Sequence, residues 1–266
     1  MLGRQLDLFS AAGFSTSDEP ATPIELPPLV PSNLDDLSLV AALPGARLTD
    51  CHALCAEAAR RRLAAAVPAL EALCRRFKGF GLERAVPEQV AALHGLAAIR
   101  TPEAAAAVSR IIVDNVVQGP ALHDAVHAAV HLGCRLPPGA SLPLLRHNDA
   151  SVRAGACRCA RPHAEVMPLL LDLLDDLHRP VAVAAACALG RAGKVEALPI
   201  LARLLRDAPT EEVIDAVSSL ADDDCIVQLG RIARTNPELS AAAIDALGSI
   251  DHPRARSVAA AVRRLG

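Results

Sequence analysis

Apolar residues recur every three to four positions along most of this chain, which is the spacing of one face of an α-helix. The ends of successive apolar segments fall at Leu96, Leu132, Cys159, Leu189, Leu220 and Leu247. The intervals between them run from 27 to 36 residues. An internal period of this length is typical of stacked helical repeats, in which each unit buries its apolar face only against its neighbours.

Each period contains two predicted helices. The predicted leading helices include Met167–Asp175, Leu198–Asp207 and Ile226–Arg234. The predicted trailing helices include Ser151–Arg161, Pro180–Gly190, Thr210–Leu220 and Glu238–Leu247. Alanine is abundant in the trailing helices, and its small side chain allows neighbouring helices to approach closely. The pattern therefore predicts helix pairs that stack along one continuous core.

Composition favours the same all-α interpretation. Apolar residues make up 52% of the 266 residues, but aromatic residues only 2%, and tryptophan and tyrosine are both absent. The aromatic residues that favour β-strands are therefore nearly missing, whereas the best helix former, alanine, is frequent. Buried area must come from Ala, Leu, Val and Ile.

Two stretches resemble a known repeat family. The run NDASVRAGACRCA (Asn148–Ala160) places an Asp before a helix, then a Val-Arg pair, then spaced alanines. This pattern is similar to the trailing helix of HEAT repeats. The run VAVAAACALGRAGKVEALPILARLLRD (Val181–Asp207) resembles the phycobilin-lyase type of HEAT repeat. The resemblance covers roughly residues 87–266 and implies a right-handed α-solenoid; it says little about function, because repeat solenoids have many roles.

Three regions are expected along the chain: a flexible tail (1–33), N-terminal helices that cap the solenoid (34–86) and the repeats (87–266). Residues 20–31 hold five prolines, which prevent a helix and favour extended structure. Ser32 is the candidate N-cap of the first helix. Residues 49–77 are expected to be helical, with a break at Pro68.

The tail carries the most informative short motif, QLDLF at residues 5–9. It resembles the pentapeptide by which bacterial replication and repair proteins dock on the sliding clamp. The resemblance implies that Gln5, Leu6, Leu8 and Phe9 bind this partner, since a few apolar anchors can supply most of a binding energy. The alternative is a short amphipathic helix that caps the first repeat.

A second candidate surface consists of arginines near the ends of leading helices, where they could follow a phosphate backbone. They are Arg146, Arg203, Arg206, Arg231 and Arg234. Asp175 occupies the corresponding position in another unit and interrupts the row. Basic residues also stabilise helix C-termini, so solvated helix ends are the alternative.

Histidines and cysteines are weaker candidates for a metal site. His123, His127 and His131 recur at helical spacing, which suits zinc, but structural or surface histidines are the favoured interpretation. Cys157 and Cys159 point to different faces of a helix, and no CxxC motif occurs. The eight cysteines are therefore expected to be reduced core residues, and no cofactor or metal is expected.

Charge and targeting signals complete the prediction. The net charge is −3; residues 1–50 carry −5 and the remainder +2, far from the strongly basic footprint of a dedicated DNA binder. No secretory signal or membrane span is expected, so a cytoplasmic location is predicted. The favoured function is a non-enzymatic adaptor. The alternatives are a nucleic-acid-binding solenoid that uses the arginine row, and an enzyme on a HEAT scaffold such as a lyase-like protein.

Overall fold

The computed structural model describes residues 30–264, except for the side chain of Arg263. Within this range the chain forms helices and one isolated β-bridge, between Leu136 and Ala160. The helices are η1 (Pro31–Asn33), α1 (Asp36–Ala42), α2 (Leu48–Arg60), η2 (Ala64–Ala66), α3 (Val67–Arg76), α4 (Pro87–Ile99), α5 (Pro102–Val113), α6 (Ala121–His131), α7 (Pro138–Leu145), α8 (Ala150–Cys159), α9 (Met167–Asp172), η3 (Leu173–Asp175), α10 (Arg179–Arg191), η4 (Val195–Ala197), α11 (Leu198–Asp207), α12 (Glu211–Ser218), α13 (Asp223–Thr235), α14 (Pro237–Ser249) and α15 (Pro253–Arg263).

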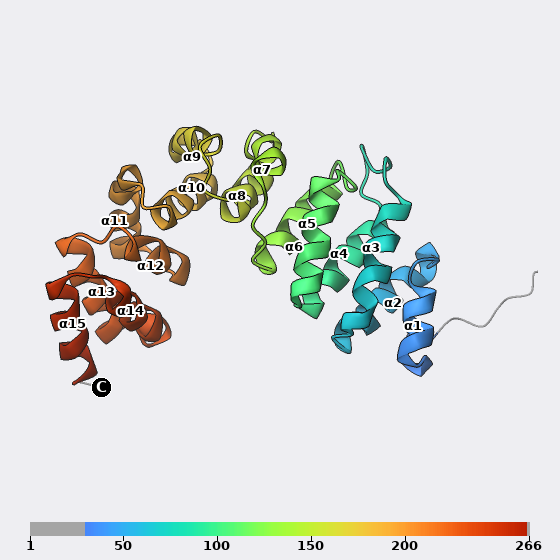
Figure 1. Cartoon of the computed structure of the whole chain (residues 1–266), viewed down its shortest axis with the longest axis horizontal. Helices are drawn as coiled ribbons and strands as arrows, with labels where there is room; N and C mark the ends of the chain where they lie inside the picture. Colours follow the sequence, from blue (N-terminus) through green and yellow to red (C-terminus); the bar gives the residue numbers. More distant parts are fainter. Residues whose placement is uncertain (1–29, 265–266) are drawn as a thin grey trace, which may run out of the picture. The chain divides into compact units, whose positions relative to one another are not determined.

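The helices form two series that follow the chain (Figure 1). The even-numbered helices are the trailing helices, and each packs against the next one, from α2 through to α14. The odd-numbered helices are the leading helices; α3 packs against α5, α5 against α7, and α11 against α13. Each trailing helix also contacts a leading helix beside it in the chain. This stacking confirms the prediction of an all-α solenoid built from helix pairs.

The core is made of small and aliphatic side chains, as the composition predicts. Leucine, valine, isoleucine, alanine and the cysteines fill one continuous cluster that extends from Leu39 to Val262. Gly190 in α10 lies where the backbone of the next trailing helix comes close. A methyl group at this position would lie 2.7 Å from the carbonyl oxygen of Ala216 in α12 and 2.6 Å from Leu201 Cδ1 in α11. Here only a glycine lets the helices meet without a shift of the backbone.

Two details near the N-terminus differ from the prediction. The N-cap of α1 is Asp35, whose carboxylate accepts a hydrogen bond from the Ser38 amide at 2.7 Å; Ser32 lies in η1 instead. The break within residues 49–77 lies at Arg62, which adopts a left-handed conformation with φ of 50°. Pro68 does not break a helix, because it stands in the first turn of α3, where no amide hydrogen is required.

The Val-Arg pattern noticed in the sequence links one repeat to the next. Asp149 caps α8 by accepting from the amide of Ser151 at 2.7 Å. Arg153, one turn later, donates two hydrogen bonds to Asp176 in the loop before α10, at 2.9 and 3.1 Å. Its Nη1 also donates to the carbonyl oxygens of His147 and Asn148. One side chain thus ties together two successive inter-helix loops.

Candidate partner-binding surfaces

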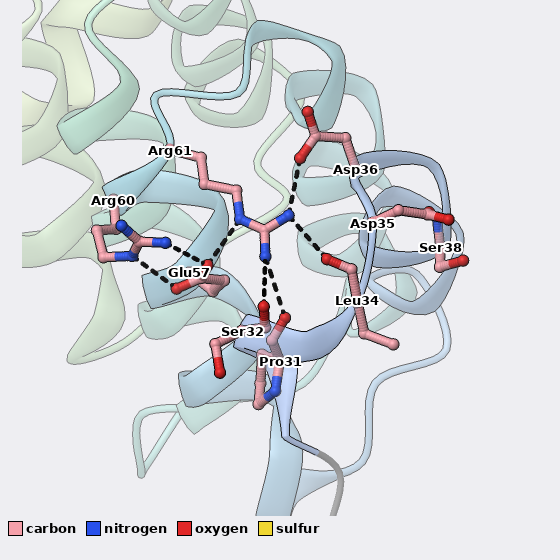
Figure 2. Close-up of polar contacts among 9 residues, drawn as sticks. All are labelled: Pro31, Ser32, Leu34, Asp35, Asp36, Ser38, Glu57, Arg60 and Arg61. Atoms are coloured by element: carbon pink, nitrogen blue, oxygen red, sulfur yellow. Dashed lines mark hydrogen bonds and ion pairs between the residues drawn. The ribbon is translucent and has the colours of Figure 1, made fainter.

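The tail motif Gln5, Leu6, Leu8 and Phe9 lies outside the residues that the structure describes. The described chain begins with the segment to which the tail is joined, Pro31–Asp36, and Figure 2 shows the side chain that holds this segment. Arg61, at the C-terminal end of α2, donates five hydrogen bonds to the segment and to α2 itself. Its acceptors are the carbonyl oxygens of Pro31, Ser32 and Leu34, and the carboxylates of Asp36 and Glu57.

Arg61 has five N–H groups, and each of them meets an acceptor. The shortest of these contacts is with Glu57 Oε1, at 2.6 Å, and Asp36 Oδ1 lies 2.8 Å away. Arg60 donates to both oxygens of Glu57, at 2.7 and 2.8 Å. Hydrogen bonds from Arg60 and Arg61 lower the pKa of Glu57 from its ordinary value of 4.5 to about 2. The base of the tail is therefore fixed by a charged network that persists over the physiological pH range.

The five arginines of the predicted row, here the arginine row, are all exposed. Arg203 and Arg206 lie on α11 and Arg231 and Arg234 on α13, and these helices pack together. Arg146 is the C-cap of α7, which contacts α9 instead, and Asp175 of η3 follows α9. The structure thus brings four of the five arginines onto neighbouring helices.

Several arginines of the solenoid are held by carboxylates, whereas the arginine row is not so held in the described part of the chain. Arg61, Arg75, Arg110, Arg153 and Arg158 all form ion pairs with carboxylates. Within residues 30–264, no ion pair is found for the arginine row; Arg234 Nε donates to the carbonyl oxygen of Gly230 at 3.2 Å. Their guanidinium groups remain available to a ligand, or simply to water.

The predicted histidine row lies on α6, and its members contact other side chains. The rings of His123 and His127 stack, with centroids 6.3 Å apart. His131 Nε2 accepts a hydrogen bond from Arg100 Nε at 2.8 Å. Nearby, His94 lies 3.1 Å from Asp124. In the part of the chain that the structure describes, no three His, Cys, Asp or Glu side chains come together as a metal site.

All eight cysteines are buried and form no disulfide, so Cys157 and Cys159 belong to the core as predicted. Burial raises the pKa of six thiols to about 12. They are Cys55, Cys74, Cys157, Cys159, Cys187 and Cys225. Thiols of this kind stay protonated and are poor nucleophiles and poor metal ligands.

The trailing helices share a half-buried ion-pair network that the sequence did not reveal. Arg158 of α8 lies 3.1 Å from both carboxylate oxygens of Glu212 in α12, although α10 packs between these two helices. Arg191 of α10 lies 3.8 Å from Glu212 and 3.9 Å from Asp215. Three successive trailing helices are therefore joined by one shared carboxylate. Arg158 and Glu212 are 54 positions apart in the chain, a separation at which only the repeat register could have indicated the contact.

Comparison with known proteins supports the repeat type but goes no further. Residues 140–221 match a family model described as HEAT repeats. The matched part, from α7 to the end of α12, includes the contacts of Asp149 and Arg153 described above. No curated protein matches the chain. In the described residues, no helix has the length and apolar character needed to cross a membrane.

Proposed function

We propose that this protein is a non-enzymatic, cytoplasmic interaction scaffold, whose helical repeats bind a protein partner and whose tail docks on the bacterial sliding clamp. The repeats support the first half of this proposal, because stacked helix pairs expose long surfaces of adjacent helices. The observation that carries the second half is the run QLDLF at residues 5–9, joined to the fold at a segment fixed by Arg61. Such an arrangement would raise the concentration of the bound partner at sites of DNA replication or repair.

A pull-down with purified sliding clamp tests the tail. Leu8→Ala with Phe9→Ala removes both apolar anchors, and retention on the clamp is expected to be lost. Leu2→Ala with Phe14→Ala makes the same change of composition in the same tail and should leave retention intact. Equal retention of all three proteins, or equal loss in both double variants, would refute clamp docking through this motif.

A second function is favoured by one observation, the exposed arginine row on α11 and α13. A solenoid that bound duplex DNA through this row would lose affinity steeply as salt rises, because each phosphate contact releases counterions. Replacing Arg203, Arg206, Arg231 and Arg234 by glutamine should then abolish binding and flatten the salt dependence. Replacing Lys78, Arg84, Arg135 and Arg161, which lie outside the row, makes the same change of net charge and serves as the control. If the two sets of substitutions act equally, the row is no specific site.

A further inference from the structure

A groove lies between α12 and α14 on the surface of the C-terminal repeats. It has a volume of about 370 Å³, and each helix contributes one stripe of four residues at helical spacing. The stripe of α12 is Glu211, Ile214, Asp215 and Ser218; that of α14 is Ala242, Asp245, Ala246 and Ser249. The floor is apolar: Ala242 is half-buried, and Ile214 and Ala246 are buried.

Every polar group that lines the groove presents a hydrogen-bond acceptor. Glu211, Asp215 and Asp245 are exposed carboxylates, and a carboxylate can only accept. The two serines have already used their hydrogens. Ser218 Oγ donates to the carbonyl oxygen of Asp215 at 2.7 Å, and Ser249 Oγ donates to that of Ala246 at 2.8 Å. Each serine oxygen therefore offers only lone pairs to a ligand.

Local helix stability explains the charge of Glu211, which lies in the first turn of α12, but not that of the two aspartates of the groove. Acidic side chains stabilise the first turn of a helix and are unfavourable near its C-terminus. Asp215 lies three residues before the end of α12, and Asp245 lies four before the end of α14. Neither α12 nor α14 contains a single Lys or Arg. Arg191 lies 3.9 Å from Asp215 and also 3.8 Å from Glu212 beside the groove; in residues 30–264 no ion pair is found for Glu211 or Asp245.

We propose that the groove between α12 and α14 binds an arginine side chain carried by a segment of a partner protein. The aliphatic stem of arginine would lie over Ala242, next to the buried Ile214 and Ala246, and its charged end would face the carboxylates of Asp215 and Asp245. Guanidinium has five donors and no acceptor, which complements a wall made of acceptors alone. Phosphate is repelled by the same wall, so the groove excludes nucleic acid. This inference rests on the scaffold half of the proposed function, because it names the chemistry of the partner that the repeats bind.

The full-length chain and a synthetic probe test this proposal. The probe is a capped, alanine-based helical peptide with one tryptophan and with arginines at positions i and i+4. Since the chain has neither Trp nor Tyr, tryptophan emission and anisotropy report on the peptide alone. Replacing each arginine of the peptide by citrulline, which keeps the shape and removes the charge, should weaken binding by about tenfold or more.

Matched variants separate the groove from overall charge. Asp215→Asn with Asp245→Asn is expected to weaken binding by about tenfold, whereas Asp172→Asn with Asp175→Asn, on the leading side, should change it by less than about twofold. Ala242→Leu fills the groove without changing its charge and should also weaken binding. Circular dichroism shows whether this variant folds. If it does not fold, the test rests on the two double asparagine variants.

The proposal would be overturned if the arginine peptide showed no detectable binding. It would also be overturned if the two double asparagine variants weakened peptide binding equally. These outcomes are distinguishable from a failure of clamp docking, because the clamp pull-down depends on Leu8 and Phe9 and not on the groove. If the protein instead binds duplex DNA through the arginine row, the arginine peptide would not bind the parent protein. The double variant Asp215→Asn with Asp245→Asn would then still bind DNA undiminished.

Discussion

Arg153 and Asp176 join two successive repeats through a two-pronged ion pair, with Nε–Oδ2 at 2.9 Å and Nη2–Oδ1 at 3.1 Å. The side chains are 13% and 9% exposed, so solvent screens the pair little. Asp176 also accepts from the amide of His178 at 2.8 Å, which fixes the start of α10. Hydrogen bonds from Arg153 accordingly lower the pKa of Asp176. This geometry makes the pair a connection between the loops rather than a solvated surface contact.

Asp176→Asn should therefore destabilise the fold, by about 1–3 kcal/mol, because the buried guanidinium of Arg153 loses its counter-charge. Urea unfolding followed by circular dichroism at neutral pH measures the effect. Asp175→Asn is the matched control, since the neighbouring carboxylate is exposed and has no ion pair among the described residues. A midpoint for Asp176→Asn that equals that of Asp175→Asn would show that the pair contributes no stability.

Acid should weaken the N-terminal network around Arg61. Because the pKa of Glu57 is lowered from 4.5 to about 2 in the folded protein, its carboxylate stabilises the fold fully above pH 4.5. That contribution is lost as the pH falls from 4.5 towards 2, when the folded protein must also take up the proton. Stability should consequently be flat near neutral pH and decline in acid.

The variant Glu57→Gln isolates this contribution. It should be less stable than the parent at neutral pH, and the difference between the two should shrink as the pH falls below 4.5. Urea midpoints measured across this range give the result, with Glu83→Gln in an exposed loop as the control. Parallel acid curves for Glu57→Gln and the parent would mean that Glu57 is not the titrating group.

Periodicity and capping chemistry are enough to predict the repeats, but contacts across the repeats are not. The Asp-Val-Arg pattern at Asp149–Arg153 indicates a repeat, and its role as a connector becomes visible only once the fold brings Asp176 beside it. Proline in the interior of a helix commonly kinks or ends it, which is why the sequence predicts a break at Pro68, yet in a first turn proline is compatible with a helix. The left-handed residue that does separate α2 from α3 is an arginine, Arg62, which carries no such signal.

The candidate sites likewise differ in whether the sequence alone could predict them. The arginine row could be predicted because Arg146, Arg206 and Arg234 share one position of the repeat, and Arg203 and Arg231 share another, one turn earlier. The groove between α12 and α14 could not be predicted, because it depends on which faces of the two helices lie side by side. Residues that line it from opposite helices, such as Ser218 and Ser249, are 31 positions apart in the chain. Gln89 is a further case: its amide donates to carbonyl oxygens of Cys74, Phe77 and Val116, three residues with no pattern in common. Such contacts follow from packing, which a single sequence does not specify.

Two glycines of the trailing helices should respond to alanine with opposite signs. A methyl group at Gly248 in α14 would meet no neighbouring atom within 4 Å, so Gly248→Ala should raise stability by about 0.5–1 kcal/mol, the helix preference of alanine over glycine. At Gly190 the same methyl group would lie 2.7 Å from the backbone oxygen of Ala216, and a backbone cannot rotate aside as a side chain can. Gly190→Ala should therefore lower stability, by about 1–3 kcal/mol, through overpacking between α10 and α12. Thermal and urea unfolding of both variants measure the difference, and stabilisation by Gly190→Ala would mean that the trailing helices are not in contact at this point.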